Sequence, residues 1–151
     1  MTDAVLGHGT CLMLHDGSAN FALANYVAIG EIREGPDEDE SVAEVDVTHH
    51  KSPGRRREYI AGLVEGATLS MTCNYLPEDA TQDRTTGLIK LFNDGTVRQY
   101  AIVEPRKTNA KWLTFDALIT SKAITRPVDD AMQISFDMRK TGNEAEIDPP
   151  T

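Results

Sequence analysis

Long apolar runs and secretion signals are missing from this 151-residue sequence. No stretch approaches the roughly 18 consecutive apolar residues that a membrane-spanning helix needs. The first residues, Met1 to Ala4, also lack the basic and apolar regions of a signal peptide. We therefore expect no membrane anchor. We also expect the two cysteines, Cys11 and Cys73, to be reduced and to pack as small hydrophobic side chains.

Positive charge is scarce as well. The chain has 15 lysines and arginines against 24 aspartates and glutamates, which gives a net charge of −9. Because phosphate binding needs clustered cations, this balance excludes free affinity for nucleic acid through a basic face. An acidic surface has the opposite effect, since it repels DNA. The length and a hydrophobic content of 40% are typical of one soluble globular domain, which we place over residues 1–151.

Motifs of catalysis and of metal binding are also missing. The sequence has no Gly-x-Ser-x-Gly elbow, and Gly7-His8-Gly9 opens no helix that could hold a phosphate. Cys11 and His15 share a face of a predicted strand but stand roughly 13 Å apart along it. Zinc ligands lie about 2.0–2.3 Å from the ion, so these two residues cannot bind one ion together. We predict a protein with no cofactor, no metal site and no enzymatic activity.

Hydrophobic residues recur with a period of two along most of the chain, which is typical of strands with one face in a core. The clearest predicted strands span 67–75, 112–119 and 132–139, and weaker ones span 10–15, 26–32, 42–47 and 96–104. One segment, 79–92, has helical spacing, with Asp79 and Gln82 resembling a capping box and Asn93-Asp94-Gly95 as a stop signal. The pattern predicts a mainly β protein (α+β), an antiparallel β-sandwich with one flanking α-helix.

Three segments are too polar to belong to a core. Residues 33–41 are mostly acidic, 48–58 form the basic end of a long β-hairpin loop, and 142–151 are expected to be a flexible acidic tail. Residues 1–9 are expected to form an N-terminal arm. The long loop between two hydrophobic strands indicates a device that reaches a neighbouring molecule, and we interpret 48–58 as an assembly loop.

The charges of these segments are segregated. Between Glu31 and Asp46 lie eight carboxylates and one base, and between Lys51 and Arg57 lie four bases and no acid. One interpretation is two solvated loops. The other is a pair of complementary surfaces through which identical subunits meet head to tail. The candidate contact residues are Asp37, Glu38, Asp39 and Glu40 on one side, and His49, His50, Lys51, Arg55, Arg56 and Arg57 on the other.

Several short motifs occur in a defined order between about residues 25 and 142. They are Val27 to Ile32 followed by Gly35-Pro36, Val45 to Thr48, Tyr59 to Gly66, Asn74 to Pro77, Asn93 to Thr96, and Lys140 to Gly142. In this order and spacing they resemble the tail tube proteins of lambda-like bacteriophages, whose tails are long, flexible and non-contractile.

The resemblance implies a structural virion protein that consists of the tube domain alone. Six copies would form a ring whose inner strands close into a β-barrel, and rings would stack into the tail tube that conducts DNA during ejection without specific binding. The long loop would bridge successive rings. Implied partners are other copies of the chain, the tape-measure protein, the tail terminator and baseplate or tail-tip proteins. Implied locations are the virion tail and, during assembly, the host cytoplasm.

Two alternative functions stay open at this point. A related tube protein of a secretion or contractile system shares the fold, and sequence patterns separate it poorly from a phage tube. A small ligand-binding β-barrel would need polar groups that converge inside an apolar pocket, and the sequence shows no trace of them.

The strand 42–47 raises the question of the channel wall. Its apolar residues Ala43, Val45 and Val47 alternate with Glu44 and Asp46. If the apolar residues pack in the core, the two carboxylates point the other way. They would then face either the lumen of a ring, where they would line the DNA path, or the outer surface, where they would aid solubility.

Overall fold

The computed structural model describes residues 7–106 and 108–151. Its strands are β1 (Cys11–His15), β2 (Tyr26–Ala28), β3 (Ile32–Asp46), β4 (Tyr59–Asn74), β5 (Arg98–Val103), β6 (Trp112–Thr125) and β7 (Gln133–Ile147). The helices are α1 (Leu88–Asp94) and two 3-10 turns, Leu23–Asn25 and Pro53–Arg55.

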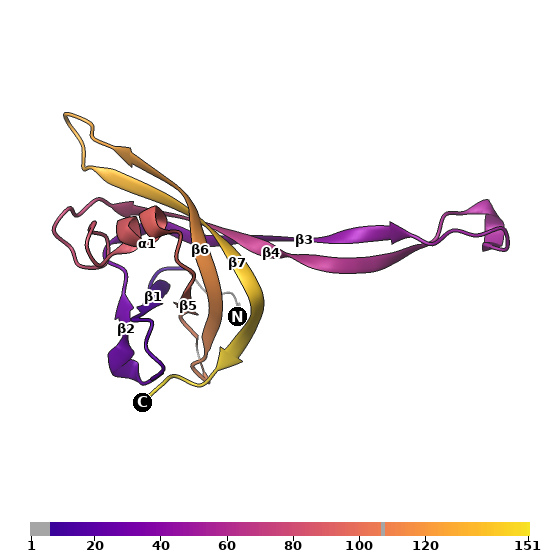
Figure 1. Ribbon diagram of the computed structural model, residues 1–151, viewed down its shortest axis with the longest axis horizontal. Coiled ribbons are helices and arrows are strands. Elements are labelled where there is room, and N and C mark those ends of the chain that lie inside the picture. The colour runs from indigo at the N-terminus through magenta and orange to yellow at the C-terminus, as the bar shows by residue number, and fades with distance from the viewer. Residues whose placement is uncertain (1–6, 107) are drawn as a thin grey trace, which may run out of the picture.

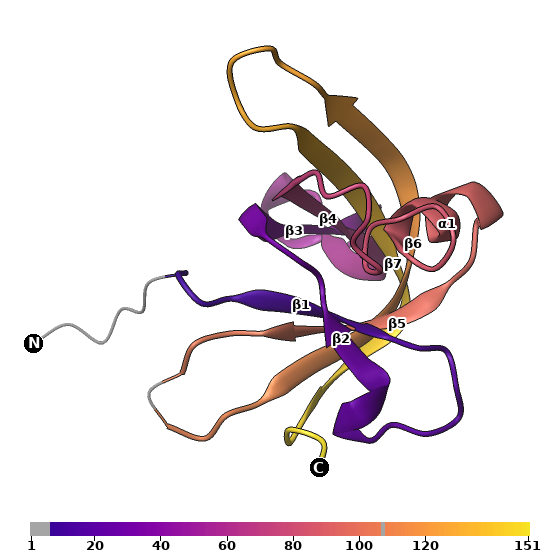
Figure 2. The same cartoon turned by 90° about the vertical axis from the view of Figure 1, so that its left-hand side faces the viewer.

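The strands form one antiparallel sheet of seven in the order β2-β1-β5-β6-β7-β4-β3. The sheet curls strongly, so that β1 approaches β3 and two layers of strands face each other (Figures 1 and 2). Strand β1 pairs with a strand that is distant in the sequence, since Cys11 lies opposite Val103 of β5. The predicted mainly β fold with one helix is confirmed.

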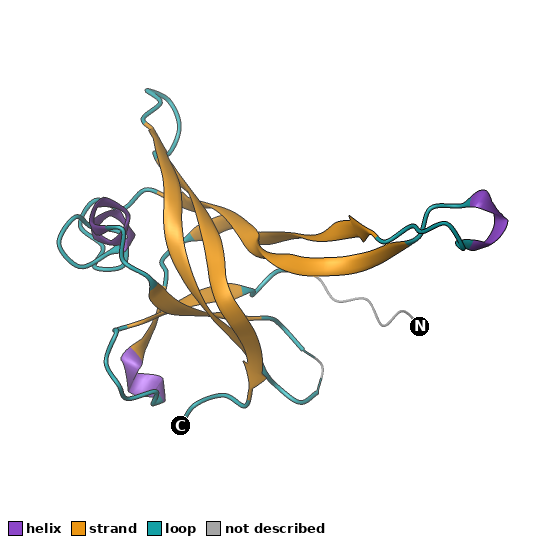
Figure 3. Cartoon of the chain, turned by 45° about the vertical axis from the view of Figure 1, so that its right-hand side comes forward, coloured by secondary structure: helices purple, strands orange, loops and turns teal. Residues whose placement is uncertain are grey.

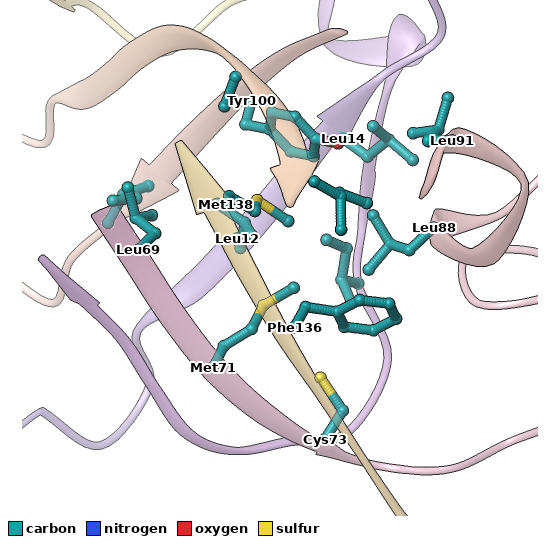
Figure 4. Packing of buried hydrophobic residues seen from close by; sticks show 14 of the residues in the cluster. Leu12, Leu14, Leu69, Met71, Cys73, Leu88, Leu91, Tyr100, Phe136 and Met138 are labelled. Carbon is teal, nitrogen blue, oxygen red and sulfur yellow. The ribbon is translucent and has the colours of Figure 1, made fainter. Parts of the chain in front are cut away.

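The core lies inside the curl and follows the period of two that the sequence shows. Alternate residues of β4 (Leu69, Met71, Cys73) and of β7 (Ile134, Phe136, Met138) are buried against β1, β5 and β6. Helix α1 closes the core with its buried Leu88 and Leu91 (Figure 4). Each such side chain contributes about 1.5–3 kcal/mol through burial, so this interior fixes the body from which the rest of β3 and β4 projects.

A long two-stranded arm leaves this body. The pairing of β4 with β7 begins at Thr68 and Arg139, whereas the pairing of β3 with β4 continues out to Asp46 and Tyr59. We call residues 40–66 the arm. Its shaft comprises 40–47 and 59–66, and its tip comprises 48–58. The arm extends far beyond the sheet and ends in the 3-10 turn of the tip (Figures 1 and 3).

The acidic segment 33–41, predicted to be a loop, is instead the first half of β3. It hydrogen-bonds to β4 with Glu34 opposite Thr72, Asp37 opposite Ser70 and Asp39 opposite Thr68, with bulges between these pairs. As the edge strand of the sheet it leaves its outer side in water, where carboxylates are tolerated and discourage unwanted pairing. Composition alone therefore misled the prediction.

The predicted helix over 79–92 is wrong at its start. Asp79 and Gln82 do not cap it, because the buried amide of Gln82 accepts from the Leu76 N–H and donates to the carbonyls of Gly30 and Asn74. Such side-chain bonds compete with helical backbone bonds, and the segment forms turns up to Gly87. The predicted stop is confirmed, since Gly95 ends α1 in the left-handed conformation.

The ends of the chain also differ from expectation. The predicted tail 142–151 continues β7 as far as Ile147, which pairs with Trp112. Two basic residues from another part of the sequence hold this segment, through the ion pairs of Arg106 with Glu146 and of Lys111 with Asp148. The predicted strand 26–32 is divided between β2 and the start of β3. Of the predicted N-terminal arm, 1–6 lie outside the described residues.

Gly66 marks the place where the arm leaves the body. A Cβ added there would lie 2.1 Å from the carbonyl oxygen of Lys140 in the neighbouring strand. Gly66→Ala is therefore expected to force the two backbones apart and to lower the free energy of unfolding by about 2 kcal/mol, within the range seen for overpacking. Urea unfolding followed by circular dichroism measures the change.

Gly142→Ala is the matched control for this substitution. Its Cβ would meet no atom within 4 Å, but its φ is +75°. It should lose only about 1 kcal/mol through backbone strain. If Gly66→Ala unfolds at the wild-type urea concentration, the close approach at Gly66 does not constrain the arm.

Candidate functional site: the projecting arm

The tip of the arm concentrates positive charge. Among the described residues, no carboxylate lies within 4.0 Å of the charged groups of Lys51, Arg55, Arg56 or Arg57. All four are exposed. His49 and His50 flank the same loop and are exposed as well. The predicted basic block is thus held at the far end of the molecule (Figure 3), where it is available to a partner.

Hydrogen bonds within the tip give it a defined shape. The Ser52 hydroxyl donates to Glu58 at 2.6 Å and accepts from the His49 backbone N–H at 3.0 Å. At the start of the loop, Asp46 accepts a hydrogen bond from the Thr48 N–H at 2.9 Å. Hydrogen bonding from the side chain of Thr48, and then from its backbone, lowers the pKa of the Asp46 carboxyl. The acids nearest the tip therefore serve its own folding, and the arginines are left for other contacts.

The shaft exposes apolar side chains that no other part of the described chain buries. Leu63 is 88% exposed and Val64 65%, and Tyr59 and Ile60 are also exposed. A two-stranded hairpin is marginally stable in water by itself. Apolar surface on such an element is typical of an interaction site, because burial against a partner would stabilise both. The sequence analysis predicted hydrophobic strands here, as part of a device that reaches a neighbour, but did not predict that their apolar side chains are exposed.

Glu44 and Asp46 lie on one face of the shaft, opposite Ala61 and Tyr59 respectively. The premise of the sequence argument does not hold, because Val45 is 44% and Val47 40% exposed instead of packing in the core. Neither face of the shaft is covered within one chain. That Glu44 and Asp46 face a lumen stays a prediction about the assembled protein.

Lys140 anchors the root of the arm to the body. Its side chain is only 5% exposed, and its Nζ lies 2.9 Å from Glu38, 3.9 Å from Glu40 and 2.6 Å from Glu144. It also lies 4.6 Å from the centre of the Phe115 ring. Because Lys140 belongs to β7 and Glu38 to β3, this contact spans β4 and fixes the direction in which the arm leaves.

The charge state of Lys140 is secure at neutral pH. Burial alone would lower its pKa, but hydrogen bonds to Glu144 and Glu38 and the charges of these two carboxylates outweigh that effect and raise the pKa. The carboxylates of Glu38, Glu40 and Glu144 approach within 4.8 Å of one another and so resemble a metal-binding cluster. The ammonium group of Lys140 lies among them and offsets one of the three negative charges, so the cluster is an internal ion-pair network.

The structure thus divides the predicted contact residues. Asp37 and Asp39 are without an ion pair among the described residues, whereas Glu38 and Glu40 contact Lys140 of their own chain. The acidic and basic blocks lie on the same hairpin, one at its root and one at its tip. Contact of either block with another subunit stays a prediction. Lys140 itself was missed, since nothing in the local sequence links it to residues about a hundred positions earlier.

Residues 14–146 match the protein family described as lambda phage tail tube protein. The chain belongs to this family. A tail tube protein is a structural part of the virion tail, and its family is not one of enzymes. No helix among the described residues has the length and apolarity to cross a membrane. Comparison with curated protein sequences finds no significant match.

Solved structures of tail tubes share the fold. A chain from the tail of an empty gene transfer agent particle, refined with C6 symmetry, has a TM-score of 0.75 at 21% identity, covering 94% of this tail tube protein and 98% of that chain. A chain of the SPP1 tail tube gives 0.70 at 14%, covering 98% and 81%. A chain of the sheath-tube complex of an extracellular contractile injection system gives 0.61 at 10%, covering 95% and 91%. At these identities the likeness shows the fold alone.

Proposed function

We propose that this tail tube protein forms hexameric rings that stack head to tail into a non-contractile tail tube, through which DNA passes during ejection. The observation that carries the proposal is the arm, with its exposed apolar shaft and its basic tip. Such an element is useful only when another molecule covers it. The family match and the six-fold symmetry of the similar gene transfer agent tail support a ring of six.

The acidic composition suits the proposed channel. A net charge of −9 leaves few cations to trap the phosphates of passing DNA. In this proposal Glu44 and Asp46 contribute to the inner wall, and the basic tip contacts a neighbouring ring and stays away from the DNA. The tape-measure protein would occupy the lumen before ejection, and terminator and tail-tip proteins would close the two ends.

The related tubes of contractile systems are the second candidate, because their chains have the same fold at a TM-score of 0.61. They differ in that a sheath surrounds the tube. The match to the lambda tail tube family favours the non-contractile form.

Negative-stain microscopy of the purified protein tests the proposal. We expect six-fold rings at low concentration and stacked tubes of uniform diameter as the concentration rises. The charged shaft and tip predict that ionic strength changes the fraction assembled. Monodisperse single subunits at every concentration and salt would contradict the proposal.

A further inference from the structure

His15, the last residue of β1, is a titratable side chain buried in the body. Its side chain is only 2% exposed. The ring stacks on Phe21, with 4.7 Å between the ring centres, and meets the edge of Tyr26 at 4.9 Å. Phe21 belongs to the connection between β1 and β2, residues 16–25, which we call the β1–β2 turn. A buried polar ring needs partners for both of its nitrogens, and these partners decide which nitrogen carries a proton.

Hydrogen bonds from the β1–β2 turn fix the ring of His15 in its neutral form. Nε2 lies 2.8 Å from the carbonyl oxygen of Asn20, which can only accept, so Nε2 carries the proton. Nδ1 accepts from the Gly17 N–H at 3.0 Å, so it carries none. A proton added to Nδ1 would displace the Gly17 N–H, because the two donors cannot share one lone pair. The uncharged ring therefore ties the turn to β1, and a charged ring cannot keep both bonds.

A carboxylate stands beside the same nitrogen. Asp16 Oδ1 lies 3.7 Å from Nδ1 of His15, beyond hydrogen-bond distance, and accepts from the Ser18 N–H at 2.8 Å. Hydrogen bonds from the Asn25 side chain and then from the Ser18 backbone lower the pKa of the Asp16 carboxyl to about 2, so it stays ionised in mild acid. A protonated Nδ1 thus has Asp16 nearby as a new acceptor. The same groups can form two arrangements, one for each charge state of the ring.

Other titratable or charged groups of the described residues approach the ring from four elements. Tyr26 of β2 stays neutral, because burial raises its pKa. Arg98 of β5 donates to the His15 carbonyl at 3.2 Å. Lys90 of α1 and Asp116 of β6 line the two hollows that His15 borders. Of these residue types, only histidine ordinarily changes its charge between about pH 5 and 8, so the ring is the group expected to respond to mild acid.

The β1–β2 turn depends on these few bonds. Of the described residues 16–25, none is buried. A segment with so few buried contacts opens at a low free-energy cost. The turn also holds the C-terminal end of the chain, since the Leu23 N–H donates to the carbonyl oxygen of Thr151 at 3.3 Å, and the two lie side by side in both views (Figures 1 and 2). A change at the ring of His15 therefore affects two surface segments at once.

We propose that His15 is a pH-sensitive switch for the β1–β2 turn. The neutral ring keeps the turn closed through Gly17 and Asn20. The protonated ring takes its proton from the solvent, donates to Asp16, and leaves the N–H groups of Gly17 and Ser18 to water. Opening of the turn also frees the C-terminal end of the chain. The inference concerns the single chain and does not depend on the proposed tube.

Hydrogen exchange of the full chain, followed by mass spectrometry between about pH 8 and about pH 5, tests the proposal. Deuteration of the imidazole C2 hydrogen reports the charge of each histidine ring. Amide exchange of residues 16–25, corrected for the intrinsic effect of pH, reports the turn. We expect the turn to lose about fivefold in protection as the ring of His15 becomes charged, which corresponds to the loss of one hydrogen bond. His50, which is exposed at the tip of the arm, should titrate without such a change around it.

Three variants separate the switch from other effects of acid. His15→Gln keeps a donor and an acceptor but cannot become charged, so it should hold the turn closed at every pH tested. Asp16→Asn keeps an acceptor for the Ser18 N–H but removes the carboxylate that attracts the proton, so the turn should open at a lower pH than in wild type. His50→Gln is the matched control and should behave as wild type does.

Several results would overturn the proposal. They are unchanged protection of residues 16–25 while the ring of His15 becomes charged, a ring that stays neutral down to about pH 5, and opening that persists in His15→Gln or that occurs at the wild-type pH in Asp16→Asn. Equal loss of protection along the whole chain would indicate general unfolding and would overturn it as well. If a variant does not fold, the titration of the wild-type protein decides by itself.

Discussion

Lys140→Met is expected to lower the free energy of unfolding by about 2–3 kcal/mol and to prevent tube growth. Removing one partner of a buried ion pair typically costs 3–5 kcal/mol, and we reduce this figure because Glu38, Glu40 and Glu144 are partly exposed. Met keeps the stem that packs on Phe115, so the loss reports the missing charge. Repulsion among the three carboxylates then separates the root of β3 from β7 and misdirects the arm. Urea unfolding and tube counts by microscopy measure the two effects.

Lys122→Met is the matched control, since Lys122 also lies over an aromatic ring, at 5.4 Å from the centre of Phe92, and has no ion pair with a carboxylate of the described residues. It should change neither quantity. Adding Glu38→Gln and Glu144→Gln to Lys140→Met should recover part of the stability. Full stability of Lys140→Met alone would show that the ion pairs do not hold the arm.

The same anchor has a defined dependence on pH. The pKa of Lys140 is raised in the folded protein above the ordinary value of 10.5. A raised pKa of this kind adds stability that is complete below the unfolded value and is lost as the pH rises through the folded value. The stability difference between wild type and Lys140→Met should therefore be constant across neutral pH and shrink above about pH 10.5.

Reversing Arg55, Arg56 and Arg57 to Glu is expected to leave the fold intact and to abolish tubes. The three side chains are exposed at the tip, where substitutions change stability by less than about 0.5 kcal/mol. At an interface, like charges that face each other cost several kcal/mol, which is enough to reduce association more than a hundredfold. Circular dichroism reports the fold, and microscopy reports the tubes.

The change of all three arginines to Lys is the matched control, because it keeps the charge and removes the paired guanidinium donors. Tubes from the Lys variant and none from the Glu variant would assign the effect to charge. Normal tubes from the Glu variant would mean that the basic block only keeps the loop in water.

The parts of the fold that the sequence predicts are those in which local pattern and burial agree. Alternation over 67–75 and 132–139 identified two strands correctly, because each buries one face in the same core. The segment 33–41 escaped prediction because an edge strand needs only hydrogen bonds from one neighbour, and carboxylates do not prevent these. The helix start failed because Gln82 found buried partners in distant strands.

In the candidate site, too, only the features that are local in the sequence could be predicted. The basic tip could be found from Lys51 to Arg57, because its charges are adjacent in the sequence. Lys140 could not, since its partners Glu38 and Glu40 reach it only through the order β7-β4-β3. The hollow of about 380 Å³ beside α1 could not be predicted either, because its lining residues Leu14, Leu91 and Arg98 come together only in the curled sheet.

The late pairing of β1 with β5 has a consequence for synthesis on the ribosome. The two strands of the arm are close in sequence, so they can pair transiently soon after they emerge, before the body that stabilises them is made. The sheet of the body needs β1 to pair with β5, which is made some ninety residues later. A nascent chain therefore presents the strands of its arm before its body is complete. In the proposed tube, a chain that is still being translated would lack the body that a neighbouring subunit contacts, so assembly would wait for finished subunits.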